Sequence, residues 1–143
     1  QRQQLINLMA QIEKRIQEEN ARPRKRYVSP STQEVSYARY YDVIRRKIET
    51  KGTLDFPQSQ GQKLYGSLIM VITIDTRGQV ISAEVSQSSG NPLLDFHAKQ
   101  IARNAAPYGP FNEAMRREMD QLALVTRFSF DHNNTLQTTL QGE

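Results

Sequence analysis

The sequence predicts a small α+β domain: a three-stranded antiparallel sheet with two helices on one face, in the order helix, strand, strand, helix, strand, preceded by a further helix and a linker. Residues 64–75 and 79–87 are rich in β-branched and large apolar side chains around a Thr-Arg-Gly turn, which indicates a β-hairpin. Apolar residues recur at helical spacing in 37–48 and in 94–105. Residues 122–130 form a long apolar run typical of a last strand.

Composition limits the class of protein. With 143 residues, the chain is long enough for one domain with attached segments. It has no cysteine, which excludes disulfides, thiolate metal sites and cysteine nucleophiles, and which fits a periplasmic location without establishing one. No signal peptide is visible, so any export or anchoring segment is expected upstream of Gln1.

The net charge of +4 comes from the N-terminal segment. Residues 1–30 carry seven Lys/Arg and three acidic residues, whereas residues 31–143 carry twelve of each. A nucleic-acid-binding domain usually carries its basic surplus on the folded core. We therefore expect no nucleic-acid partner.

Residues 1–20 are expected to form a polar helix or stalk. Leu5, Met9, Ile12 and Ile16 are spaced by four, three and four residues, as in the seam of a coiled coil. Only about two heptads are present, so a solvated helix, or the end of a longer one, is favoured. The alternative is a stalk that dimerises or binds a partner, and a homodimer is left open.

Residues 21–30, ARPRKRYVSP, are expected to form a basic linker. Pro23 and Pro30 break helices, and the four cations between them and beside them repel one another into an extended chain. A solvated spacer is the favoured interpretation. The alternative is contact with something anionic, such as a membrane surface.

The first helix of the domain should follow. Ser31 and Glu34 have the S-x-x-E spacing of a capping box. Gly52 fits the left-handed position just beyond the helix end. The helix should bury one stripe of side chains, Tyr37, Tyr40, Tyr41, Ile44 and Ile48.

Each strand of the hairpin should turn one set of side chains inward. The inward set of the first strand is expected to be Leu68, Met70, Ile72 and Ile74. The inward set of the second strand is expected to be Ile81, Ala83 and Val85.

The segment after the hairpin contains the residue types of a serine hydrolase, namely Ser88, Ser89, Asp95 and His97. No G-x-S-x-G elbow is present, and residues two apart on a helix do not face each other. Asn91-Pro92 instead has the pattern of a helix start, with an N-cap followed by proline. We therefore expect a strand-to-helix turn, no catalytic residue, no metal site and no cofactor.

The last strand, residues 122–130, carries a single charge, on Arg127. If this strand is a sheet edge, it is a template to which a partner can add a strand. The alternative is that the tail, or the segment before the first strand, already covers this edge. The tail, residues 132–143, is expected to be flexible, with a short extra strand as the alternative.

Roughly residues 22–130 also resemble a known family, the C-terminal domain of TonB, the periplasmic energy transducer of Gram-negative bacteria. The matching pieces occur in one order. They are RPRKRY, YARYYDVIRRKIE, the aromatic-proline pair Phe56-Pro57, GSLIMVITIDTRGQV, SSGNPLLD, AAPYGPF and LVTRFSF. The resemblance implies that residues 31–131 form the TonB-like domain.

The resemblance further implies a mechanism and partners. Such proteins are anchored in the inner membrane by an upstream helix that works with the ExbB–ExbD motor, and they bind the TonB box of an outer-membrane transporter for siderophores, haem or cobalamin. The TonB box is implied to add as a strand to the last strand of the domain. The partner-binding residues implied are Asp55, Phe56, Pro57, Gln58, Leu122, Ala123, Leu124, Val125, Thr126, Arg127, Phe128, Ser129 and Phe130.

Two other functions remain as alternatives. A TolA-like envelope protein uses a similar small domain for protein interaction. The basic N-terminal segment also suits a binder of anionic envelope polymer or lipid.

Overall fold

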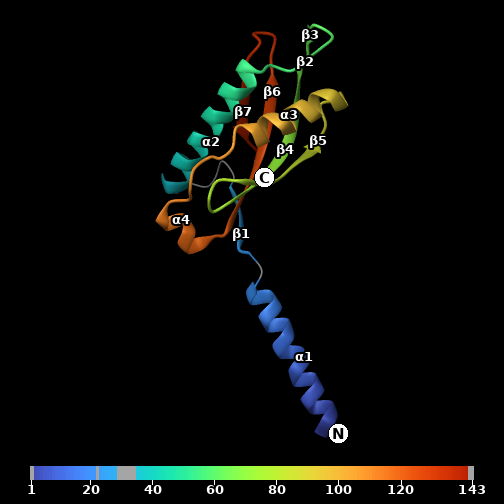
Figure 1. The fold of residues 1–143 in the computed structure, drawn as a ribbon, viewed down its shortest axis with the longest axis vertical. Coiled ribbons are helices and arrows are strands. Elements are labelled where there is room, and N and C mark those ends of the chain that lie inside the picture. Colours follow the sequence, from blue (N-terminus) through green and yellow to red (C-terminus); the bar gives the residue numbers. More distant parts are fainter. Residues whose placement is uncertain (1, 22, 29–34, 142–143) are drawn as a thin grey trace.

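The computed structural model describes residues 2–21, 23–28 and 35–141 (Figure 1). The expected capping box of Ser31 and Glu34 lies outside these residues. The elements, in chain order, are α1 (Arg2–Ala21), β1 (Lys25–Val28), α2 (Val35–Leu54), β2 (Gln58–Ser59), β3 (Gln62–Lys63), β4 (Gly66–Asp75), β5 (Val80–Gln87), α3 (Pro92–Asn104), α4 (Glu113–Glu118), β6 (Gln121–Phe130) and β7 (Leu136–Leu140).

The main sheet has five strands and is mixed, in the order β1-β6-β4-β5, with β7 also paired to β6. The α+β class and the β4–β5 hairpin agree with the sequence, but the expected three-stranded antiparallel sheet is wrong. The observed sheet has two further strands, β1 from the basic segment 21–30 and β7 from the tail 132–143. β1 runs parallel to the first half of β6, and β7 runs antiparallel to its second half. The flanking segments pair there because a long apolar edge strand exposes unpaired backbone groups.

The hairpin differs from expectation at one side chain. Ile81, predicted to point inward, is 46% exposed, whereas Ala83 is buried. The β4–β5 register shifts between Thr73 and Ile74, so that Thr73 pairs with Ser82 and Ile74 pairs with Val80. A β-bulge inserts one extra residue in this way and reverses the side-chain alternation beyond it. Val80 therefore takes the inward place that simple alternation assigned to Ile81.

One core lies between the sheet and the two longer helices of the domain. The inward side chains of β4 are all buried, as expected, and they pack with residues of α2 and α3 in a single cluster. Asn91 caps α3, since its side chain accepts a hydrogen bond from Leu93 N at 3.0 Å. The helix residues in this core are Tyr37, Tyr40, Ile44, Ile48, Leu94, Ala98, Ile101 and Ala102.

Gly52 does not end its helix, because α2 continues to Leu54. A Cβ atom built on Gly52 would lie 2.2 Å from Leu136 Cδ2 and 3.0 Å from Leu136 Cβ. The glycine is therefore required for the close approach of β7 to α2, and the left-handed C-cap expected from the sequence is wrong.

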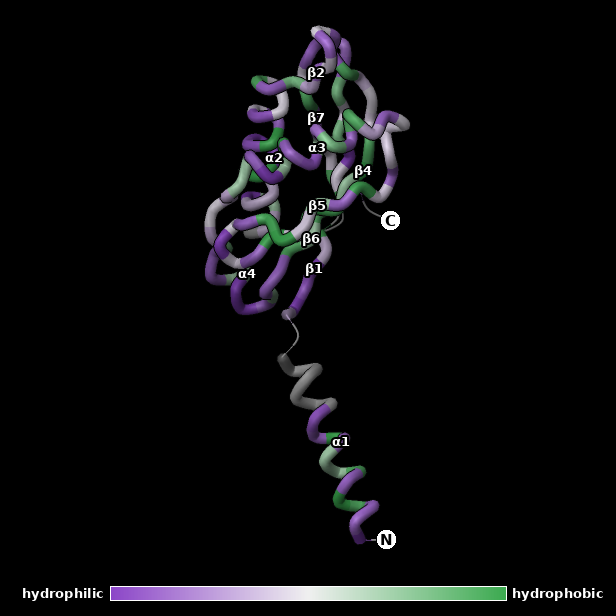
Figure 2. Tube along the Cα trace, turned by 45° about the vertical axis from the view of Figure 1, so that its right-hand side comes forward, coloured by the Kyte–Doolittle hydropathy of each residue, from purple (hydrophilic) through white to green (hydrophobic). Residues whose placement is uncertain are grey.

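α1 stands apart from the sheet in Figures 1 and 2. The apolar side chains of its first three turns are open to solvent, with Leu5 59% exposed, Met9 55% and Ile12 51%. Within the described ranges, no helix is both long enough and apolar enough to cross a membrane.

Candidate functional site

The predicted docking strand lies inside the sheet. β6 pairs with β4 along all of its residues, from Gln121 to Phe130. Its other side is divided, with residues 121–124 paired to β1 and residues 126–130 paired to β7. The structure therefore agrees with the alternative prediction that this edge is already covered: the segment before the first strand covers one half, and the tail covers the other.

β7 is fixed on its outer side by side chains of α2. Leu136 N donates to Thr53 Oγ1 at 3.1 Å, and Thr138 N donates to Glu49 Oε2 at 2.7 Å. The backbone of Leu140 bonds to the Tyr41 hydroxyl, and burial raises the pKa of this tyrosine. These three residues of β7 alternate along the strand, so their N–H groups point away from β6. Because α2 takes up these donors, the outer N–H groups of β7 are not available to a partner strand.

β1 is held differently, by one buried side chain, Val28, and by ion pairs at the surface. Arg24 Nε lies 3.2 Å from Asp120 Oδ2, and Arg26 Nη1 lies 3.0 Å from Glu118 Oε2. Hydrogen bonds from Arg24 lower the pKa of Asp120. The pKa of Glu118 is lowered first by the Tyr37 hydroxyl and then by Arg26. Two cations of the expected basic linker thus bind acidic residues of the same domain.

The aromatic-proline segment meets the other end of β6. Phe56 follows α2 directly, is 7% exposed, and packs edge-on against Phe130 with ring centroids 5.6 Å apart. Lys63 Nζ lies 5.6 Å from the centre of the Phe56 ring, within the range of a cation–π contact. The structure therefore joins the two segments that the sequence predicted as one site, at the C-terminal end of β6 only.

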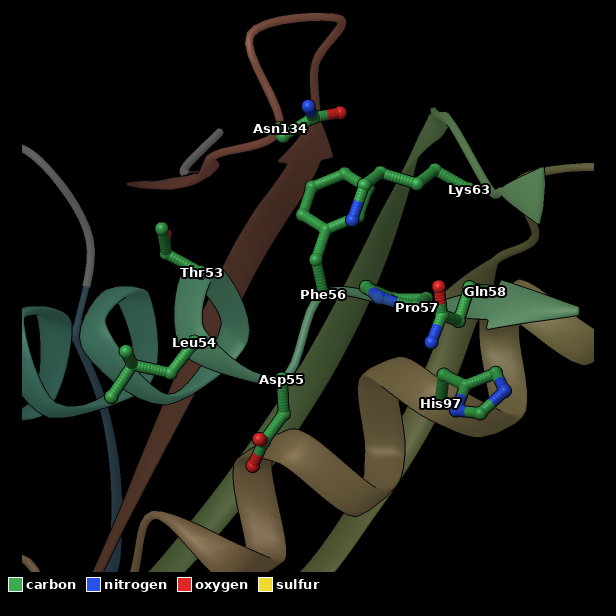
Figure 3. Close-up of a pocket in the computed structure, with 9 residues that line it drawn as sticks. All are labelled: Thr53, Leu54, Asp55, Phe56, Pro57, Gln58, Lys63, His97 and Asn134. Atoms are coloured by element: carbon green, nitrogen blue, oxygen red, sulfur yellow. The ribbon is translucent and has the colours of Figure 1, made fainter. Parts of the chain in front are cut away.

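A cavity of about 450 Å³ opens beside this segment (Figure 3). Phe56 and Pro57, both buried, contribute apolar surface to it, and Asp55 and Lys63 contribute charges. Asp55 also binds Lys51, with Nζ 2.6 Å from Oδ2. The lining residues are Thr53, Leu54, Asp55, Phe56, Pro57, Gln58, Lys63, His97 and Asn134. A mainly polar lining with two apolar side chains in it can take both the backbone and the side chains of an extended peptide.

Sequence reasoning missed five of these residues as members of the site: Thr53 and Leu54, which directly precede the predicted segment, and three residues from other elements. Lys63 comes from the β2–β3 hairpin, His97 from α3 and Asn134 from the turn between β6 and β7. His97 was interpreted as a structural residue, and Asn134 only as part of a turn. No local pattern in the sequence indicates that these three side chains lie close together, because only the tertiary packing of their elements brings them to the cavity.

The hydrolase-like segment is a hydrogen-bonded turn. Asp95 Oδ1 accepts bonds from Ser89 N at 2.9 Å and from Ser89 Oγ at 2.7 Å, and Asp95 Oδ2 accepts from Ser88 Oγ. Burial acts to raise the pKa of Asp95, but these hydrogen bonds outweigh it and lower the pKa. Among the described hydrogen bonds of this turn, none involves His97. In the described part of the chain, no group of three or more His, Cys, Asp or Glu residues is placed to hold a metal ion.

These features define a small α+β domain in which two helices cover one face of a mixed sheet and a shaped cavity lies at the end of its central strand. Comparison with protein families matches residues 53–130 to the C-terminal domain of the Gram-negative bacterial TonB protein. The match covers more than half of the chain, which therefore belongs to this family. It is a TonB-like periplasmic domain. Neither a curated protein nor a solved structure matched the chain.

Proposed function

We propose that this chain is the periplasmic domain of an energy transducer that binds the TonB box of an outer-membrane transporter. Domains of its family generally interact with such transporters. The observation that carries the proposal is the cavity beside Phe56 and Pro57, which adjoins the end of β6 at Phe130. Both segments belong to the partner-binding set inferred from the sequence.

The cavity suits an extended peptide. Apolar side chains of the peptide pack on Phe56 and Pro57, while Lys63 and Asp55 accept groups of opposite charge at the rim. Backbone pairing extends the contact along β6, over the residues from Leu122 to Phe130. Pairing over this whole length requires that both covering strands leave, because β1 occupies residues 121–124 and β7 occupies residues 126–130 on that side of β6. Release of β1 alone opens residues 121–124.

The proposal extends to the rest of the transducer. An upstream helix anchors the protein in the inner membrane and works with ExbB–ExbD, and the energy drives uptake of siderophores, haem or cobalamin. β6 is suited to carry a pulling force, because it is bonded to three neighbouring strands and can share the load among them. α1 is the spacer that leads toward the anchor, or the site of a homodimer.

The domain acts by binding and not as an enzyme in this proposal. Binding of anionic polymer or lipid through residues 21–30 is less well supported, because Arg24 and Arg26 are engaged by Asp120 and Glu118. A TolA-like role in the envelope has the same fold but a different partner. A titration with a TonB-box peptide separates these possibilities, because only the proposed function predicts that this peptide binds.

The test is an NMR titration of the labelled chain with a TonB-box peptide. We expect the amide signals of Phe56, Lys63 and His97 to shift together as the peptide saturates the cavity. Replacing Lys63 by alanine should weaken binding by about fivefold, because the charged contact with the peptide and the cation–π contact with Phe56 are both lost. Lys14→Ala on α1 removes the same charge elsewhere and should leave the affinity unchanged. Absence of shifts at these residues at millimolar peptide would refute the proposal.

A further inference from the structure

We infer that β1 is an exchangeable strand that holds the place of a partner peptide on residues 121–124, and that Asp120 and Glu118 select arginine in that peptide. The inference rests on the proposed function for the identity of the partner, an extended segment of the transporter. It assigns a second contact to that partner, at the opposite end of β6 from the cavity.

The two strands that cover β6 are held unequally. β7 is built into the core, with Leu136 2% exposed and Thr138 5% exposed, and α2 occupies its outer N–H groups. β1 has only four residues, of which the first three are exposed and only Val28 is buried in the core. Among the described strands, β1 pairs with β6 alone. Tyr27 on β1 is 60% exposed. If a partner is to reach the backbone of β6, β1 is therefore the strand that leaves.

The surface around β1 contains a site shaped for a guanidinium group. The Arg24 guanidinium donates to both Asp120 oxygens at 3.2 Å, to Arg117 O at 2.8 Å and to Arg116 O at 3.2 Å. The two carbonyl groups belong to the last turn of α4, where the helix dipole favours a cation. A planar fork that reaches one carboxylate and two carbonyls matches arginine better than lysine.

The register of β1 defines the peptide that fits. Lys25 pairs with Gln121 and Val28 pairs with Leu124, in parallel orientation. The site for Arg24 precedes the first paired residue, and the site for Arg26 at Glu118 lies two residues further on. A partner segment that enters parallel to β6 with arginine at the first of these positions reproduces the contacts of β1. The tethered β1 competes with it at high effective concentration.

The first experiment measures this competition on the full chain. The probe is a fluorescein-labelled, end-capped peptide with the sequence of residues 23–28, PRKRYV. In an R24S/R26S variant the tethered strand is weakened, so the probe should bind about tenfold more tightly than to the unaltered chain. The matched control, R2S/K14S, removes two cations from α1 and should bind the probe as the unaltered chain does. A probe with lysine in place of its first arginine should bind about fivefold more weakly.

A disulfide lock tests whether β1 must leave. The chain has no cysteine, so K25C/Q121C in the R24S/R26S background supplies the only pair, at positions that face each other across the strands. The oxidised protein should lose probe binding and the reduced protein should regain it. Equal binding in both states would overturn the inference, and so would a lack of binding to the reduced protein at millimolar probe.

The lock also separates this inference from the proposed function. If the oxidised protein binds a TonB-box peptide with unchanged affinity, docking stands and strand exchange is wrong. If the reduced protein binds the PRKRYV probe but no TonB-box peptide, strand exchange stands and the proposed partner is wrong.

Discussion

Glu49 on α2 accepts two hydrogen bonds from Thr138 on β7, with its Oε2 atom 2.7 Å from the backbone N and 3.1 Å from Oγ1. Its other oxygen, Oε1, binds Arg45 Nη1 at 2.9 Å. A helix carboxylate thus takes the position that a neighbouring strand would have on the outer side of β7. This contact makes the tail a part of the sheet and closes that edge against a partner.

Glu49→Ala should loosen β7 and destabilise the domain by about 1–3 kcal/mol, because two partly buried donors lose their acceptor. Urea unfolding measures the loss, and hydrogen exchange should accelerate at Leu136 and Thr138. Glu84→Ala, at an exposed position on β5, is the control and should change stability by less than about 0.5 kcal/mol. Unchanged exchange in β7 of the Glu49 variant would contradict this role.

Gly52→Ala should also displace β7. The new methyl group meets Leu136 at an impossible distance, and the resulting strain of about 1–3 kcal/mol exceeds the gain in helix propensity of about 1 kcal/mol. The melting temperature should fall. In a Leu136→Ala background the same substitution should cost less, since the clashing side chain is gone. Equal costs in both backgrounds would show that the contact is unimportant.

Acid should release β1. The pKa values of Asp120 and Glu118 are lowered in the folded protein, so their contribution is present at pH values above the ordinary carboxyl range. It is lost as the pH falls through the lowered values, below about 4. The amide signals of residues 25–28 should move in that range in an NMR pH titration. In a D120N/E118Q variant the same signals should show no such step. If the step persists in this variant, groups other than Asp120 and Glu118 cause it.

Asp95→Ala should destabilise the turn before α3. The carboxylate accepts three hydrogen bonds from Ser88 and Ser89, and their loss should cost about 1–3 kcal/mol in urea unfolding. Glu84→Ala, at an exposed position of the preceding strand, is a suitable control and should be nearly neutral. A stable Asp95 variant would argue against a structural role for this network.

The hairpin, α3 and its Asn91 cap could be predicted because each depends on side chains close together in the sequence. The hairpin follows from two apolar runs around Gly78, and the cap from Asn91 beside Pro92. The inward place of Val80 could not be predicted, because a bulge depends on how β5 pairs with β4. Four of the nine residues that line the cavity, Asp55 to Gln58, were anticipated through the family resemblance, whereas Lys63 and His97 reach the cavity only through tertiary packing.

The sequence by itself determined the α+β class, the order of the main elements and the family. Local hydrophobic periodicity and turn residues carry that information. Only the tertiary structure decided that β6 has neighbours on both sides and that Arg24 binds Asp120 across the domain. A short basic segment and a polar tail are weak strands alone. They become strands because β6 presents unpaired backbone groups, and because Asp120 and Glu49 supply contacts far away in the sequence.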